Sequence, residues 1–167
     1  EVVADSVSPQ GIRLTTFKLR YPRIIHAEFM THRKLSRNAS GSRAVPNRKL
    51  RQEAWDPRLR AYPSSFGRNQ RGMQADATLE AEHAVQATHS WLRARDQAVL
   101  EAEFLMNQGV HKQQVNRLLE PWAWHTMVRT GTEWENFFNL RCHPAAQPEM
   151  QKIAMMARDA LAKSTPR

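Results

Sequence analysis

The most regular segment of the chain, residues 77–108, predicts one long helix. Its small and apolar side chains recur at helical spacing, and Gly109 follows at a position where helices commonly end. Many residues of this apolar stripe are alanines, and such short side chains let a second helix approach closely, from the same chain or from another subunit. Any fold for this chain must therefore pack other elements against one long helix.

The other periodic segments predict a sheet and several shorter helices. Residues 1–8 and 12–21 alternate with period two around a turn, which is typical of a hairpin, and the aromatic and β-branched segment 122–130 predicts a third strand. Helices are expected over residues 23–31, 46–55, 110–119, 132–140 and 149–162. The predicted fold class is α/β (α+β): an antiparallel or mixed sheet with the long Ala-rich helix and flanking helices, in a single domain over residues 1–167.

Positive charge is concentrated in the first half of the chain. The net charge is +9, and residues 13–71 carry fifteen Lys or Arg against three acidic residues. This excess indicates a phosphate-bearing partner, either a phosphorylated small molecule or a nucleic acid. A basic nucleic-acid-binding module is therefore one alternative, although the cations are not interleaved with aromatic residues and no nucleic-acid reader motif is present. A basic surface that serves only solubility is the other interpretation.

A single cysteine, Cys142, limits the chemistry open to the chain. One thiol makes neither a disulfide within the chain nor a multi-cysteine zinc site, and the histidine spacing predicts no metal site. The neighbouring Arg141 is a cation that can activate a thiol, but a small buried side chain is the simpler interpretation. Low cysteine content is typical of a cytoplasmic protein, and no apolar run is long enough to cross a membrane.

Residues 31–43 form the most polar segment and predict an anion-binding loop. The segment combines one His, four Lys or Arg, three Ser and one Asn around a single Gly. Such donors can hold a phosphate and a uracil-like ring together. The alternative is a polar loop whose Ser and Asn side chains bond only to its own backbone. A second loop is expected over residues 56–73, where the stretch 66–74 either covers a site as a lid or is a mobile surface loop.

Three sequence blocks resemble the flavin-dependent thymidylate synthases. The first is Thr31-His32-Arg33-x-x-Ser36-x-Asn38-Ala39-x-Gly41-x-Arg43, against the family's Arg-His-Arg-x-x-Ser-x-Asn-Glu-x-Ser-x-Arg. The second is Arg117-Leu118-Leu119-Glu120-Pro121, against Arg-x-x-Leu-Pro. The third is Asn136-Phe137-x-x-x-Arg141 with Ala146-Gln147-x-Glu149-Met150, against Asn-Phe-x-x-x-Arg with Ala-Gln-x-Glu-Ile. Three blocks in one order are far more specific than any single block.

The resemblance implies an enzyme that binds FAD and converts dUMP to dTMP without a cysteine nucleophile. Methylenetetrahydrofolate would supply the carbon and NADPH the hydride, in a homotetramer whose active sites form where subunits meet. The site residues implied by position are His32, Arg33 and Asn136 for the flavin, and Ser40, Ser42, Arg43 and Arg117 for the nucleotide. Arg141 would face the pyrimidine edge, where its charge stabilises the anionic uracil ring and so favours reaction at carbon five.

The chain also departs from the family pattern. Thr31, Ala39 and Gly41 stand where the first block has Arg, Glu and Ser, and Glu120 replaces the Leu of the second block. Losing polar contacts to a substrate often changes which substrate is accepted. One alternative is therefore hydroxymethylation, or another modification at carbon five, of dUMP or dCMP. Another is a relative that keeps the fold without catalysis.

Overall fold

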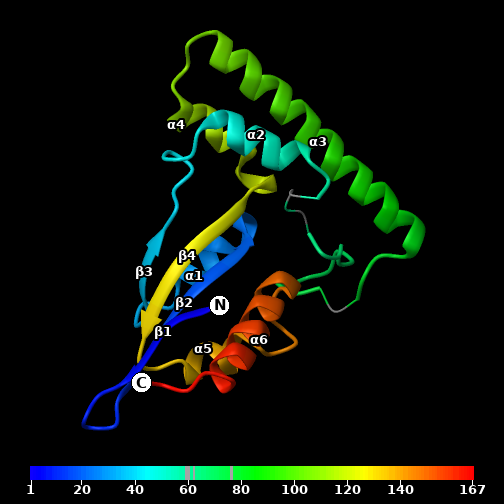
Figure 1. Cartoon of the computed structure of the whole chain (residues 1–167). Helices are drawn as coiled ribbons and strands as arrows, with labels where there is room; N and C mark the ends of the chain where they lie inside the picture. Colours follow the sequence, from blue (N-terminus) through cyan, green and yellow to red (C-terminus); the bar gives the residue numbers. More distant parts are fainter. Residues whose placement is uncertain (59–60, 62, 76) are drawn as a thin grey trace. The chain divides into compact units, whose positions relative to one another are not determined.

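The computed structural model describes residues 1–58, 61, 63–75 and 77–167, and they form two compact units (Figure 1). Unit 1 comprises Glu1–Tyr21, Ile25–Ala39 and Thr126–Arg167, and unit 2 comprises Pro22–Ile24 and Ser40–His125. The expectation of one domain over the whole chain stays a prediction. Among the helices of the described residues, none has both the length and the apolar character needed to span a membrane.

The sheet has four strands in the order β1-β2-β4-β3 (Figure 1). Strands β1 (Val2–Val7) and β2 (Arg13–Pro22) form the predicted antiparallel hairpin, whose turn contains Gly11 at φ +80°. Glycine adopts this left-handed conformation without steric cost. Strand β4 (Trp124–Gly131) pairs antiparallel with β3 (Ser36–Ala39). Together with the long helix of unit 2, this sheet confirms the predicted α/β class.

Strand β3 corrects the prediction that residues 31–43 are entirely loop. Its backbone pairs with β4, so that Arg37 lies opposite Arg129 and Asn38 lies opposite Val128. All four side chains of β3 are exposed. A strand without a buried face lacks the alternation of apolar and polar residues by which strands are recognised in a sequence. Backbone pairing, rather than side-chain burial, therefore forms this edge strand.

The inner face of the sheet carries the core of unit 1. Alternate residues of β2 are buried, as period two predicts: Thr15, Phe17, Leu19 and Tyr21. Two short helices, α1 (His26–Met30) and α5 (Glu135–Arg141), add Phe29 and Phe137, whose ring centroids lie 5.8 Å apart. Burial of each such side chain contributes roughly 1.5–3 kcal/mol. This aromatic packing holds α1 and α5 against each other, and His32 and Arg141 lie at or just after their C-terminal ends.

A buried carboxylate ties the hairpin to the segment after the last helix, α6 (Pro148–Ala162). Asp5 accepts hydrogen bonds from Arg13 Nε at 2.9 Å, Arg13 Nη2 at 2.6 Å and Ser164 Oγ at 2.6 Å. Arg13 Nη2 also donates to the carbonyl oxygen of Leu161. The Arg13 guanidinium holds the pKa of the Asp5 carboxyl well below its usual range. The carboxylate thus joins two ends of the chain within unit 1.

Unit 2 is helical and is arranged around the long helix α3 (Ala81–Asn107). The helices α2 (Asn47–Trp55), α4 (Lys112–Val115) and η2, a 3-10 helix over Asn116–Trp122, pack with it, and Figure 1 shows α2 alongside α3. Their shared core consists of Leu50, Ala54, Val99, Ala102, Val115, Leu119, Trp122 and Ala123. Of the predicted Ala-rich stripe, Ala102 belongs to this core and Trp91, Ala98 and Leu105 pack against it, whereas Ala81 and Ala94 are exposed.

Several predicted helix boundaries are wrong. Helix α3 begins at Ala81 rather than at residue 77, because Thr78 pairs with Gly67 in an isolated bridge. The segment predicted to end at residue 119 continues through Pro121 as the 3-10 helix η2. The helix predicted to begin at Thr132, whose side chain is a common N-cap, begins instead at Glu135 as α5: the buried Trp134 precedes it, and Trp134 Nε1 donates to Gly131 O at 3.0 Å. Tertiary packing overrides the local capping signal there.

Candidate functional site

The predicted site residues divide into two groups, one in each unit. His32, Arg33, Asn136 and Arg141 belong to unit 1, and Ser40, Ser42, Arg43 and Arg117 belong to unit 2. The polar segment 31–43 crosses from one unit to the other between Ala39 and Ser40.

In unit 1, His32 and Arg141 contact each other although they lie 109 residues apart in sequence. Arg141 Nε donates to His32 Nε2 at 2.9 Å, and Arg141 Nη2 donates to Thr31 Oγ1 at 3.1 Å. The Thr31 hydroxyl in turn donates to Glu28 O at 2.7 Å. His32 follows the end of α1, and Arg141 is the last residue of α5. Two helix ends therefore bring the first and third sequence blocks together.

The surroundings of His32 keep its imidazole neutral. The ring is buried and meets Phe137 edge-on, with centroids 5.0 Å apart. Burial, reinforced by the charges of Arg141 and Arg129, lowers the pKa of His32 to about 4. Because Arg141 donates to Nε2, the ring proton is on Nδ1. At neutral pH, His32 is thus an uncharged acceptor that orients the Arg141 guanidinium.

Lowering the pH from 7 to 4 is expected to destabilise the fold through His32. Its folded-state pKa of about 4 lies below the ~6.5 of an unfolded histidine, so the unfolded chain takes up the proton first. The stability that depends on the neutral ring is complete above about pH 6.5 and is lost as the pH falls toward 4, by about 3 kcal/mol. Urea unfolding across this range measures the loss. His32→Gln is the control, and an equal pH slope in that variant would contradict the assignment.

Arg129 is a functional candidate that the sequence alone did not identify. Its side chain is fully buried, and Nη2 donates to Phe29 O at 2.6 Å and to His32 O at 3.4 Å. Its Nε and Nη1 are buried without a hydrogen-bond partner among the described residues. Burial lowers the pKa of this guanidinium. In the sequence, Arg129 lies two residues after Met127. Period-two alternation therefore places both side chains on the same, buried face of β4.

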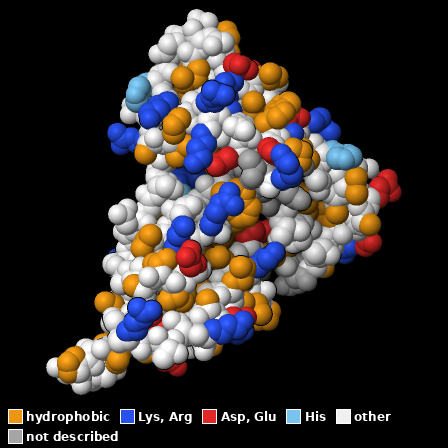
Figure 2. Space-filling model, in the orientation of Figure 1, with side chains coloured by type: hydrophobic (Ala, Val, Ile, Leu, Met, Phe, Trp, Pro, Cys, Tyr) orange, Lys and Arg blue, Asp and Glu red, His pale blue; other side chains and the backbone are white. Residues whose placement is uncertain are grey.

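Three arginines of unit 1 lack an acidic partner among the described residues. Arg37, Arg129 and Arg141 form no ion pair with a carboxylate in the described part of the chain. Arg37 and Arg129 even lie directly opposite each other across β3 and β4, where like charges are destabilising. Figure 2 shows Lys and Arg side chains spread widely over the visible surface. Uncompensated cations beside a neutral histidine suit a ligand that carries negative charge.

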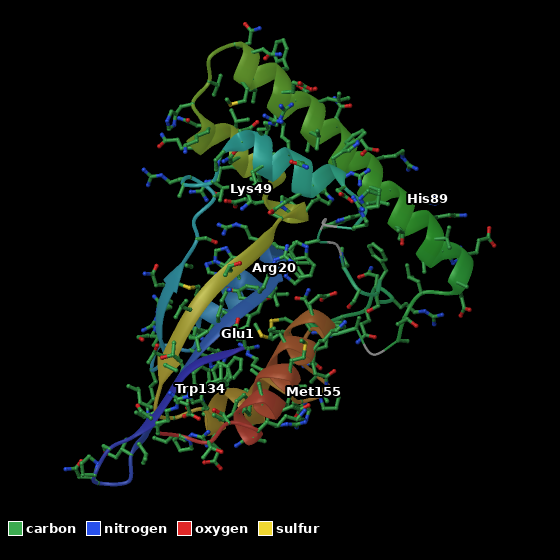
Figure 3. The ribbon with its side chains drawn as sticks, viewed as in Figure 1. Glu1, Arg20, Lys49, His89, Trp134 and Met155 are labelled. Atoms are coloured by element: carbon green, nitrogen blue, oxygen red, sulfur yellow. The ribbon has the colours of Figure 1, made fainter. Side chains whose placement is uncertain are left out.

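Asn136 faces different surroundings from the other unit 1 residues. It lines a cavity of about 630 Å³ together with Arg13, Glu135 and Leu161, and with Trp134, which is labelled in Figure 3. Neither His32 nor Arg141 lines this cavity. Within unit 1 the structure therefore brings His32 and Arg141 together but does not add Asn136 to them, and the flavin contact of Asn136 stays a prediction.

In unit 2, two of the four predicted nucleotide residues, Ser42 and Arg117, meet at Glu120. Ser42 Oγ donates to Glu120 Oε1 at 2.5 Å, and Arg117 Nη1 donates to the same oxygen at 3.3 Å. Arg23 Nη2, a residue the sequence did not single out, lies 3.1 Å from that oxygen. Arg43 is exposed and forms no ion pair with the residues that the structure describes, and Ser40 is exposed as well.

A buried asparagine explains why Ser42 and Arg117 come together. Asn116 Nδ2 donates to Ser42 O at 2.7 Å and to Val45 O at 2.9 Å, and Asn47 Nδ2 donates to Asn116 Oδ1 at 2.8 Å. Asn116 is completely buried, so these bonds are shielded from water. The first and second sequence blocks are thereby joined at the start of η2.

The thiol of Cys142 and a possible metal site were the remaining candidates for chemistry. Burial raises the pKa of the half-buried Cys142 thiol, which disfavours the thiolate that nucleophilic attack requires. A cluster of three or more His, Cys, Asp or Glu suited to a metal ion does not occur among the described residues.

Comparison with known families identifies the class of protein. The family described as Thy1, thymidylate synthase complementing protein, matches residues 7–167. The chain therefore belongs to this family, the flavin-dependent thymidylate synthases, and is a thymidylate synthase-like transferase. The resemblance seen in the three sequence blocks is confirmed.

Solved structures share the fold. A UMP/dUMP methylase, PolB, from Streptomyces cacaoi, bound with 5-Br UMP, superposes with a TM-score of 0.75 at 18% identity, covering 98% of this chain and 87% of that chain. The same methylase bound with 5-Br dUMP gives a TM-score of 0.73 at 20% identity, covering 90% of this chain and 67% of that chain. At this identity the likeness concerns the fold. Comparison with curated protein sequences finds no match.

Proposed function

We propose that this chain catalyses FAD-dependent transfer of a one-carbon unit to a pyrimidine deoxynucleotide, namely reductive methylation of dUMP to dTMP. Methylenetetrahydrofolate is the carbon donor and NADPH the hydride donor. The observation that carries the proposal is the 2.9 Å contact between Arg141 and the neutral His32. Family membership supports the reaction class. The fold neighbours described with 5-Br UMP and 5-Br dUMP support a uridine nucleotide as substrate.

In this proposal Arg141 binds the pyrimidine edge. Its Nε and Nη2 are oriented by His32 and Thr31, while Nη1 makes no hydrogen bond with the described residues. A guanidinium held in this way can donate to a uracil oxygen and stabilise negative charge as it develops on the ring. His32 assists by staying neutral, because a charged imidazole would repel Arg141.

The donors of unit 1 fit a flavin with anionic phosphates. When bound, FAD supplies the hydride chemistry that the side chains themselves lack. His32, Arg33 and Asn136 are the residues proposed to hold it. Arg33 is exposed and forms no ion pair with a carboxylate in the described residues, so its guanidinium is available to a phosphate. The uncompensated Arg37 adds positive charge on the neighbouring strand.

We further propose a cytoplasmic homotetramer with shared active sites. Helix α3 exposes large apolar side chains at Val85, Leu100 and Phe104, which are 55%, 57% and 57% exposed. Exposed apolar residues on a long helix support a subunit interface. Ser40, Ser42, Arg43 and Arg117 are proposed to bind the nucleotide, and Arg141 to act on its base.

The proposal is tested with purified protein supplied with FAD. A visible flavin band that stays with the protein through gel filtration is the first expected result. A single-turnover reaction with dUMP, methylenetetrahydrofolate and NADPH is then analysed by mass spectrometry, and dTMP is the expected product. Absence of both the flavin band and any product would contradict the proposal.

A second candidate is a different modification at carbon five, supported by the departures from the family pattern. Thr31 places a neutral hydroxyl against Arg141 where the family signature has an arginine. Running the same assay with dUMP, UMP and dCMP compares the bases and sugars directly. The mass of the product separates methylation from hydroxymethylation.

A further inference from the structure

Three donors from separate parts of unit 2 converge on one carboxylate oxygen. Ser42 Oγ, Arg23 Nη2 and Arg117 Nη1 lie 2.5, 3.1 and 3.3 Å from Glu120 Oε1. They come from the segment after β3, from the 3-10 helix η1 (Arg23–Ile25) and from η2. A hydroxyl and two guanidiniums aimed at one anionic oxygen are the contacts that a phosphate group requires.

The charges of this cluster are not balanced. Glu120 contributes one negative charge, while Arg23 and Arg117 contribute two positive charges. The side chains of Arg23 and Glu120 are only 17% and 21% exposed, so their interaction is weakly screened by water. Arg43, adjacent to Ser42, adds a further cation without an ion-pair partner among the described residues. The cluster therefore retains attraction for an anion beyond Glu120.

Arg23 is held in place from its other side as well. Its Nη1 donates to His125 Nδ1 at 2.9 Å, and this requires the Nδ1 atom to be unprotonated. With Nη1 fixed on His125, Nη2 stays directed at the Glu120 oxygen. The donor is preorganised, so little conformational freedom is lost when an anion binds to it.

We propose that Arg23 joins Ser42 and Arg117 at the phosphate-binding site of the nucleotide, and that Glu120 lowers the affinity of this site by competing with the phosphate for the three donors. The inference rests on the proposed function and adds Arg23 and Glu120 to it. A leucine, the residue of the family pattern at this position, would leave all three donors open. A carboxylate occupies them and repels the incoming phosphate, so affinity depends on displacing it.

Calorimetric titration of Glu120→Gln and Glu120→Leu tests this competition. The probes are inorganic phosphate, dUMP and deoxyuridine. Both variants are expected to bind phosphate and dUMP about tenfold more tightly than the parent chain, because the competing charge is removed. Affinity for deoxyuridine, which has no phosphate, is expected to stay unchanged.

Glu103→Gln is the matched control. Glu103 is ion-paired with Arg51 at 2.9 Å in the same unit, and removing its charge should leave all three affinities as they were. Adding Arg23→Gln to Glu120→Gln should reverse the gain in phosphate affinity. If Glu120→Leu fails to fold by circular dichroism, the isosteric Glu120→Gln variant carries the test.

Opposite results separate the alternatives. If Glu120 merely braces its partners, Glu120→Leu will bind phosphate more weakly while Glu120→Gln stays near the parent, and the inference is overturned. Unchanged phosphate affinity in both variants overturns it too. If the parent chain converts dUMP but neither variant gains affinity for phosphate, the proposed function stands and the inference is rejected. A phosphate gain in a chain that binds no dUMP supports the anion site and rejects the proposed function.

Discussion

Replacing Arg141 by methionine is expected to lower kcat/KM for dUMP by about 10²–10³-fold, the usual effect of removing one donor that stabilises developing charge. Methionine preserves much of the side-chain volume but removes the donors to His32, Thr31 and the substrate. Steady-state kinetics with dUMP measures the loss. Because the interaction strengthens as charge develops on the ring, kcat should fall more than KM rises.

Two further variants make this result specific. Arg141→Lys keeps the charge but cannot donate to His32 Nε2 and to a substrate oxygen with the same geometry, so an intermediate loss is expected. Arg158→Met removes an exposed arginine of α6, one paired with Asp159, and should leave kcat/KM unchanged. A normal kcat/KM in Arg141→Met would show that Arg141 does not act on the pyrimidine.

Replacing Asp5 by alanine is expected to lower the free energy of unfolding by about 3 kcal/mol. The substitution leaves Arg13 without its carboxylate and removes the acceptor of Ser164 Oγ and Thr15 Oγ1. Breaking one side of this partly buried pair, in which the Asp5 and Arg13 side chains are 5% and 35% exposed, is costly because the remaining charge stays partly desolvated. Urea unfolding at neutral pH measures the change.

The comparison variant for Asp5 is Asp159→Ala. Asp159 lies on α6 in an exposed pair with Arg158, and such pairs contribute at most about 1 kcal/mol. The double variant Asp5→Ala with Arg13→Met should recover part of the stability, since no unpaired charge remains. A loss for Asp5→Ala no larger than for Asp159→Ala would show that the network does not stabilise unit 1.

Local sequence patterns predicted most of the fold. The period-two pattern of residues 12–21 predicted β2 and its alternating faces, and helical spacing identified α3 and α6, because both signals depend only on neighbouring residues. Strand β3 was not predicted, because residues 31–43 were expected to form a loop. Its side chains are exposed, and what makes it a strand is backbone pairing with β4, whose partner residues lie 88 to 94 positions away.

The sequence predicted residues of the candidate site in both units, but not the residues that they contact. The sequence blocks named His32, Arg141, Ser42 and Arg117, but not their partners. Arg129 was not identified because a cation in a strand is normally expected to face solvent, and the sequence does not show which face of β4 is buried. Arg23 was missed because it belongs to none of the three blocks, and reaches Glu120 only through the packing of η1.

The sequence by itself determined the family, the class of chemistry and the residue types available, since motif order and charge are properties of the chain alone. Only the tertiary structure decided which of those residues touch. It placed a neutral His32 against Arg141, and it set Glu120 among Ser42, Arg23 and Arg117. The physical reason is that burial, hydrogen-bond geometry and pKa depend on neighbours brought together from distant parts of the chain.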